Sequence, residues 1–234
     1  MNKSTAIIIL GTAHRKREPG KQSPDGKLKE YLYSREICSE IAVKLAALDY
    51  KAEVDYMAED LPKSMQSPSV SLERSRELGM RANYVNEVCK QNGKDNVLYV
   101  SIHLNAAGAD GKWHTAGGFS VYTSKGKTKA DILAECIYNR AATNLMEYTK
   151  LMTQGKKLGY YDSKQKPLRT DTSDGDKDLE ADFSILRNTN CPAVLAECMF
   201  QDNKSDVQFL MSDEGKHALI RTFVEGIIDY IQKS

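Results

Sequence analysis

Short apolar runs alternate with amphipathic segments along this chain of 234 residues. Three of the runs are rich in β-branched and aliphatic residues and are bounded by polar positions; they cover residues 6–11, 97–102 and 193–196. Continuous apolar runs of this length are typical of strands that are buried on both faces of a parallel sheet. We therefore predict that these three runs form the centre of such a sheet.

Helical periodicity marks several of the segments between these runs. From Lys29 to Leu48, apolar residues recur at the spacing of one helix face, at Ile37, Ile41 and Leu45. The same reading predicts further helices over residues 71–91, 129–148 and 213–233, and further strands over 51–57, 118–122 and 183–187. This alternation of strands and helices predicts one α/β domain over residues 1–234, a mainly parallel open β-sheet flanked by helices.

The stretch from residue 155 to residue 182 is the least regular part of the chain. Lys, Asp, Gly and Thr dominate it, and it has few apolar residues that would anchor it. A long loop in a compact domain is usually a functional flap or a disordered segment. We predict that residues 155–182 form a long loop or insertion.

The charge balance limits the classes of function. Lys and Arg together number 33 against 32 Asp and Glu, which gives a formal net charge of +1. A dedicated nucleic-acid binder would carry a basic excess, so this balance argues against a nucleic-acid partner. No stretch approaches the roughly 20 apolar residues of a membrane span. The composition leaves the oligomeric state open.

The five cysteines and the first residues bear on the compartment. The cysteines are odd in number, widely spaced and without a C-x-x-C pair, so we predict reduced, mostly buried thiols in a protein made in the cytoplasm. The apolar stretch 6–10 is shorter than the roughly 7–15 residues of a signal-peptide core, and His14 follows soon after it. We therefore expect residues 6–10 to belong to a core strand, and we find no visible export signal.

Side chains that can bind a metal ion, two imidazoles and one carboxylate, stand at or just after the ends of the three central runs. His14 comes shortly after the first run, His103 ends the second, and Glu197 ends the third. The carboxyl ends of parallel strands meet at one edge of the sheet, where sites in open α/β folds form. Glu30 is the first residue of the helix that follows the first strand. This helix starts at the same edge of the sheet. Four residues far apart in the chain are thus predicted to converge.

Two imidazoles and two carboxylates suit a catalytic zinc ion. Zinc binds two His and one Glu in an established ligand set that leaves a position for water, and the bound ion lowers the pKa of that water to about 7. A further carboxylate that is not a ligand can accept the proton of the water and pass it to a leaving nitrogen. Glu36 and Glu40 lie on the same predicted helix as Glu30, but only Glu30 sits at its start.

The segments around these residues resemble the zinc-dependent N-acetylmuramoyl-L-alanine amidases of the type 3 family. They are residues 11–14, Glu30 with Ser34 one turn later, 101–106 and 192–200, together with Arg81-Ala82-Asn83 and Gly117-Gly118-Phe119. The matches run in the order of the family from about residue 6 to residue 230. The S-I-H-x-N-A and P-A-V-L-x-E segments are the more specific ones, and neither H-E-x-x-H nor H-x-x-E occurs.

This resemblance implies a function. The family cleaves the amide bond between N-acetylmuramic acid and the first L-alanine of the peptide stem, so it implies peptidoglycan or a muropeptide as substrate. By resemblance, His14, Glu30 and His103 bind Zn²⁺ and Glu197 is the catalytic carboxylate. The chain departs from the family at residues 11–14, which read G-T-A-H where the family usually has D-x-G-H. Residues 155–182 match no pattern of the family; in some members an inserted segment covers the zinc ion.

Two other readings stay open at this point. A zinc peptidase or another amidohydrolase would use the same site and differ in the bond that it cuts. A non-catalytic module that binds the cell wall or sugars would predict a broken site, whereas all four positions are filled here. Without a visible export signal, an enzyme of this kind would reach the cell wall through a partner, as phage endolysins do with a holin, or act from within.

Overall fold

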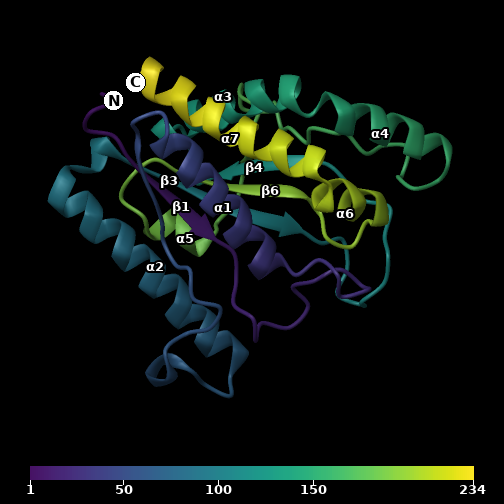
Figure 1. The fold of residues 1–234 in the computed structure, drawn as a ribbon, viewed down its shortest axis with the longest axis horizontal. Helices are drawn as coiled ribbons and strands as arrows, with labels where there is room; N and C mark the ends of the chain where they lie inside the picture. Colours follow the sequence, from purple (N-terminus) through teal and green to yellow (C-terminus); the bar gives the residue numbers. More distant parts are fainter.

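Six strands form the central sheet of the protein, in a computed structural model that describes residues 1–234 (Figure 1). Their order across the sheet is β2-β1-β3-β6-β4-β5. The strands are β1 (Ile7–Thr12), β2 (Lys51–Val54), β3 (Val97–Asn105), β4 (Phe119–Thr123), β5 (Leu179–Glu180) and β6 (Ala193–Phe200). Strands β2, β1, β3 and β6 are parallel, whereas β4 pairs antiparallel with β6 and parallel with β5. The predicted α/β fold with a mainly parallel sheet is confirmed.

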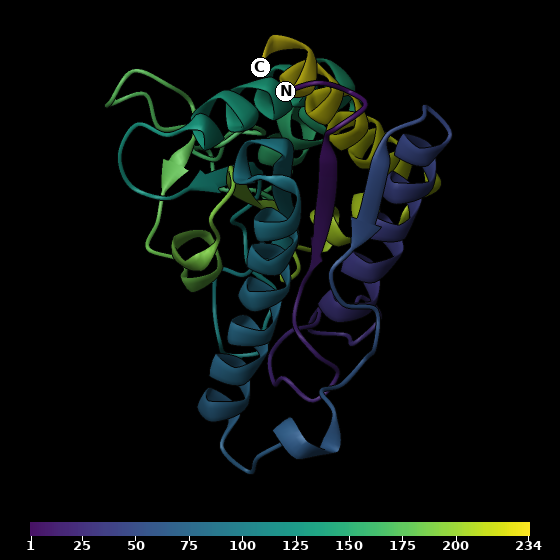
Figure 2. The same cartoon turned by 90° about the vertical axis from the view of Figure 1, so that its left-hand side faces the viewer.

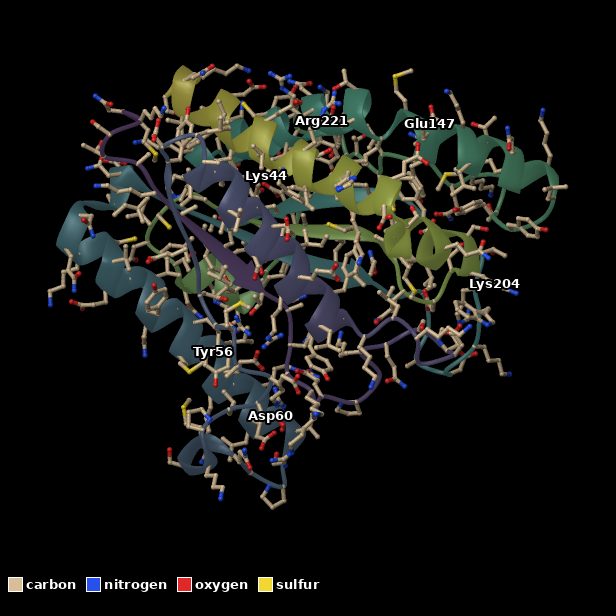
Figure 3. All side chains as sticks on the ribbon, viewed as in Figure 1. Lys44, Tyr56, Asp60, Glu147, Lys204 and Arg221 are labelled. Atoms are coloured by element: carbon tan, nitrogen blue, oxygen red, sulfur yellow. The ribbon has the colours of Figure 1, made fainter.

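Helices cover both faces of this sheet. Helices α1, α3 and α7 pack on one face and α2 and α5 on the other, so that the sheet runs between α1 and α2 in Figure 2. Lys44 and Arg221 lie on the outer, exposed side of the first layer (Figure 3). The helices are α1 (Glu30–Ala46), α2 (Val70–Asn92), α3 (Lys129–Asn144), α4 (Met146–Lys157), α5 (Ser184–Asn188), α6 (Lys204–Met211) and α7 (Asp213–Lys233), with short 3₁₀ turns at Lys63–Met65 and Lys94–Asn96.

The two helix layers explain why the central runs are apolar on both faces, with Ser101 as a buried polar residue within the second run. Side chains of successive strand residues point to opposite faces of a sheet. In β1, Ile8 and Leu10 enter the larger core under α1, α3 and α7, whereas Ile9 enters the smaller core under α2 and α5. All three are fully buried. A strand with a helix layer on each side therefore carries no polar alternation.

Three predicted elements differ from the structure. Residues 183–187, predicted as a strand, lie mostly in helix α5, which packs against α2. The predicted helix 129–148 is two helices separated at Leu145, and α4 continues to Lys157. Residues 155–157 of the predicted loop 155–182 thus form the end of α4, and Leu179–Glu180 form β5. Short apolar runs do not distinguish a strand from a buried helix, and α5 is such a case.

The state of the cysteines and the polarity of the helices match the predictions made from the composition. All five cysteines are free and buried. None of the helices combines the length and the apolar character that a bilayer crossing requires. Helix α6, which follows β6 directly, has no counterpart among the predicted elements.

Candidate metal centre

The four residues singled out in the sequence meet at the carboxyl edge of the parallel strands. His14 lies two residues after β1, Glu30 is the first residue of α1, and His103 of β3 pairs in register with Glu197 of β6. His14, Glu30 and His103 each place one potential ligand atom within 4.8 Å of the others. Glu197 lines the same cleft as the two histidines.

One carboxylate oxygen lies between the two imidazole rings. Glu30 Oε1 is 3.4 Å from His14 Nε2 and 3.2 Å from His103 Nδ1. The two rings stand edge to face, with their centroids 5.0 Å apart. Glu30 is fully buried, whereas Glu36 forms an ion pair with Lys216 at the surface. Of the acidic residues on α1, Glu30 is the one that faces the histidines.

The chain before α1 is bent so that His14 faces the centre. His14 has a φ of 44°, in the left-handed region that residues other than glycine rarely adopt. The buried Arg35 guanidinium donates hydrogen bonds to the carbonyl oxygens of Ala13 and His14. The Ser34 hydroxyl accepts from the Ala13 N–H and donates to the Ile102 carbonyl, which ties the end of β1 to β3. Ser34, one turn after Glu30, thus stabilises the backbone on which His14 lies.

Buried polar atoms without partners mark the centre. Glu30 Oε1 accepts a hydrogen bond from the Leu104 N–H at 3.0 Å, but Glu30 Oε2 is buried without any partner. Glu197 Oε2 is buried without a partner as well. Buried polar groups are nearly always satisfied in native proteins, and an exception calls for an explanation such as a bound ion. Of these two oxygens, Glu30 Oε2 belongs to the group of His14, Glu30 and His103 that could hold a metal ion.

The carboxylates make the surroundings of His14 favourable for positive charge. Burial lowers the pKa of His14, but the charge of Glu30 and the hydrogen bond with Glu18 outweigh burial and raise this pKa to about 9. Burial raises the pKa of Glu30, yet the two histidines outweigh it and hold this pKa below its usual range. For His103 burial dominates and lowers the pKa. The carboxylates that favour a proton on His14 favour a metal cation for the same reason.

Glu197 differs from Glu30 in its protonation. Burial, followed by the charge of Glu30, raises the pKa of Glu197 to about 8. Lys21 lowers it in part, because its ammonium group also borders the cleft. A carboxyl group that titrates near neutral pH suits the transfer of a proton in either direction.

A buried ionic network behind His14 contains residues that the sequence analysis missed. Glu18 Oε2 lies 3.2 Å from His14 Nδ1, and the Glu18 carboxylate is also bound by Arg15 and Arg74. Arg15 reaches on to Glu77 of α2 at 2.7 Å. Glu18 lies in an irregular loop rich in basic residues, so no periodicity marks it; its spacing of four residues from His14 is the only signal in the sequence.

The cleft that contains the centre has a volume of about 330 Å³. Basic side chains of Lys21, Arg74 and Arg81 border it, and Leu78 and Phe183 supply apolar surface. The segment after β2, with Tyr56 and Asp60, lies at the same end of the molecule as the start of α2 (Figure 3). The lining thus combines these three basic side chains with three acidic ones, Glu18, Glu77 and Glu197, beside the apolar surface.

Two further histidines and Arg187 lie outside this centre. His114 contacts Asp110 through Nε2 at 2.8 Å and borders a second cavity with Trp113. His217 is exposed on α7. Arg187 forms an ion pair with Asp182.

Comparison with known proteins identifies relatives of the whole chain. Residues 8–229 match the family described as N-acetylmuramoyl-L-alanine amidase. Among solved structures, the chain is similar to the CwlD amidase from Clostridioides difficile, solved in complex with the GerS lipoprotein, with a TM-score of 0.72, 18% identity, and coverage of 98% of this chain and 100% of the other. It is also similar to the amidase Ami1 from Mycobacterium smegmatis, with a TM-score of 0.68, 17% identity and full coverage of both chains.

A curated relative comes from a bacteriophage. The endolysin of Bacillus phage SPP1 is 27% identical over 169 residues, which cover 69% of this chain and 50% of the endolysin. The chain thus spans about half the length of the endolysin that it matches.

Proposed function

This chain belongs to the N-acetylmuramoyl-L-alanine amidase family, and on that premise we propose that it hydrolyses the amide bond between N-acetylmuramic acid and L-alanine in peptidoglycan. One observation carries the proposal: His14, Glu30 and His103 form a possible three-ligand metal site, and the buried carboxylate of Glu197 lines the same cleft. A metal site with a free carboxylate beside it is one established arrangement for the hydrolysis of an amide.

Zinc is the metal that this donor set fits. His14, Glu30 and His103 would hold it, because two imidazoles and one carboxylate form an established set for catalytic zinc. Glu30 Oε2, buried without a hydrogen-bond partner, is a donor that such an ion would satisfy. When bound, zinc supplies Lewis acidity that lowers the pKa of water to about 7 and polarises a substrate carbonyl.

Glu197 would move the proton. As a general base it accepts a proton from the attacking water, and as a general acid it delivers that proton to the nitrogen of L-alanine when the carbon–nitrogen bond breaks. The products are a lactyl carboxylate on the sugar and a stem peptide with a free amine. The raised pKa of Glu197 suits the delivery of a proton to the leaving nitrogen. A cation bound beside Glu197 would lower this pKa and favour the ionised carboxylate that accepts a proton from water.

The lining of the cleft supports a peptide as part of the substrate. Lys21 brings positive charge to its border, and Leu78 and Phe183 bring apolar surface. A stem peptide offers a carboxylate for Lys21 and aliphatic groups for Leu78 and Phe183. We infer a wall-lytic role from the similarity to the protein of phage SPP1, which is named an endolysin. In this role the chain would be made in the cytoplasm and act on the cell wall.

Incubation of the purified protein with peptidoglycan, with and without added zinc, tests the proposal. We expect zinc-dependent release of stem peptides with a free L-alanine amine, detected by mass spectrometry. His103→Ala should abolish this release, whereas His217→Ala, which removes an exposed histidine, should leave it unchanged. Cuts within the peptide would reassign the chain to the zinc peptidases. Zinc binding without any product would favour a non-catalytic binding module.

A further inference from the structure

A second cavity, with a volume of about 350 Å³, is separate from the catalytic cleft and shares no lining residue with it. The loop that follows β3 supplies Trp113 and His114 to its lining, α6, which follows β6, supplies Lys204 and Gln208, and the turn after α4 supplies Tyr160. Helices α4 and α6 lie at the same end of the molecule (Figure 1), and Lys204 marks the position of the cavity in Figure 3.

Two aromatic side chains are exposed at this cavity. Trp113, the only tryptophan of the chain, is 38% exposed, and Tyr160 is 56% exposed. Neither ring stacks on another aromatic ring of the protein. Large apolar surfaces that gather around a cavity mark a binding site more often than single exposed side chains do. The two rings are therefore available to a ligand.

The two segments that carry these rings are fixed by one buried side chain. Asn203 is 1% exposed, and its amide group donates to the carbonyl oxygens of His114 at 3.2 Å and Tyr160 at 3.1 Å. The His114 N–H also donates to the Asp202 carbonyl at 2.7 Å. The walls of the cavity are thus held in place before any ligand arrives, which lowers the entropic cost of binding.

The lining favours a sugar over a peptide. Besides the two aromatic rings it presents amide, hydroxyl and ammonium groups, among them Gln208, Thr115 and Lys204. It contains no carboxylate and no aliphatic side chain, whereas the catalytic cleft has both, for example Glu18 and Leu78. A pyranose ring has an apolar C–H face that packs on an aromatic ring, and its hydroxyls bind amide and ammonium groups. The aliphatic side chains of a peptide would find no matching surface here.

We propose that this second cavity binds one sugar ring, and that in the substrate this ring belongs to the glycan strand. The first part follows from the lining alone, whereas the second part rests on the proposed function. The strands that carry His103 and Glu197 lead directly into the loop with Trp113 and into α6. The catalytic cleft would therefore take the scissile amide and the stem peptide, and the second cavity a sugar farther along the same strand.

Trp113 supplies a direct readout, because no other tryptophan contributes to the fluorescence of the protein. The zinc-loaded, full-length protein is titrated with chitotriose, a trimer of N-acetylglucosamine that contains no lactyl amide to be cleaved. We expect a saturable change in tryptophan fluorescence with a Kd on the order of 1 mM, as befits a small, open site. No change at concentrations about 20-fold above this Kd would overturn the proposal. An alanyl-glutamate dipeptide that binds as tightly as the sugar would reassign the cavity to peptides.

Two variants of the turn after α4 separate the cavity from its surroundings. Tyr160→Ala should weaken sugar binding by roughly 3- to 10-fold, since one aromatic contact is lost while the backbone hydrogen bonds of residue 160 remain. Leu158→Ala truncates a side chain that is 66% exposed and does not line the cavity, so it should bind the sugar normally. Unchanged binding in Tyr160→Ala, or equal weakening in both variants, would overturn the proposal.

Activity measurements test the part that concerns the glycan strand. Tyr160→Ala should raise the KM for polymeric peptidoglycan by a factor similar to its loss of sugar affinity. Weakened sugar binding with an unchanged KM would overturn the assignment of the ligand to the glycan strand. Because the fluorescence titration needs no turnover, a protein that binds the sugar but releases no stem peptide would contradict the proposed function and not the sugar site.

Discussion

Glu18 and His14 are joined by a contact of 3.2 Å between the Glu18 carboxylate and His14 Nδ1, on the side of the ring opposite to Glu30. Glu18 is held in turn by Arg15 and Arg74, and its own side chain is fully buried. Burial raises the pKa of Glu18, but the hydrogen bond and charge of His14 outweigh it and lower this pKa to about 2. The carboxylate is therefore ionised at neutral pH and fixes the His14 ring with Nε2 toward the centre.

Replacing Glu18 by Gln should weaken zinc binding by roughly 10- to 100-fold, because outer carboxylates orient histidine ligands and make them more basic. Competition with a chromophoric chelator measures this affinity. Glu59→Gln, which removes an exposed ion pair with Lys16, is the matched control and should bind zinc normally. Unchanged affinity in Glu18→Gln would show that Glu18 has no part in holding His14.

Glu197→Gln should separate metal binding from catalysis. We expect it to bind zinc as tightly as the unaltered protein and to lose activity by about 10²- to 10⁴-fold, the usual contribution of a general acid–base group. Its free energy of unfolding should be equal or higher, because a buried carboxylate that is repelled by Glu30 has been removed. Full activity in this variant would exclude Glu197 as the proton carrier.

Arg81→Met should destabilise the protein strongly. The Arg81 guanidinium is 3% exposed and donates to Thr12 and Asp55, and it also donates to Glu77 at 2.9 Å. Removing one partner of a buried ion pair costs about 3–5 kcal/mol, because the other charge remains buried. Urea denaturation measures the loss. Arg221→Met, which removes an exposed ion pair on α7, should cost less than about 1 kcal/mol, and a similar loss in both variants would contradict the argument.

Asp206 should make stability depend on pH. Burial raises the pKa of Asp206 from 3.8 to about 7, although the hydroxyls of Tyr148 and Tyr161 and the Phe200 N–H donate to its carboxylate. The folded protein therefore binds more protons here than the unfolded chain. This contribution to stability is complete below about pH 4 and is lost as the pH rises through about 7, with a span on the order of a few kcal/mol.

The difference between unaltered protein and Asp206→Asn isolates this effect from other titrating groups. Urea denaturation at intervals from pH 5 to pH 8 should show that the stability advantage of the unaltered protein over the variant shrinks as the pH rises. An advantage that grows with pH would mean that the three hydrogen bonds outweigh burial and that the carboxylate is ionised throughout.

The pattern of apolar residues alone was sufficient to predict the three central strands of the sheet. Runs 6–11, 97–102 and 193–196 became β1, β3 and β6, because a strand that is covered by helices on both sides carries apolar residues on both faces. The pattern was wrong for residues 183–187, since a five-residue helix that packs one side on α2 has too few turns to display a helical period. It also missed the break at Leu145 within the predicted helix 129–148.

The sequence by itself determined which residues lie near the carboxyl ends of the strands, and thereby the convergence of His14, Glu30, His103 and Glu197, because strand direction and helix start follow from local patterns. It did not show that β3 and β6 continue past His103 and Glu197, to Asn105 and Phe200. Only the tertiary structure decided that Glu18 contacts His14 and that Asp178 contacts Thr123 of β4. Thr123 and Asp178 are 55 positions apart, and Glu18 lies in an irregular turn. Such contacts depend on how separate segments pack together, and no periodicity of the chain records them.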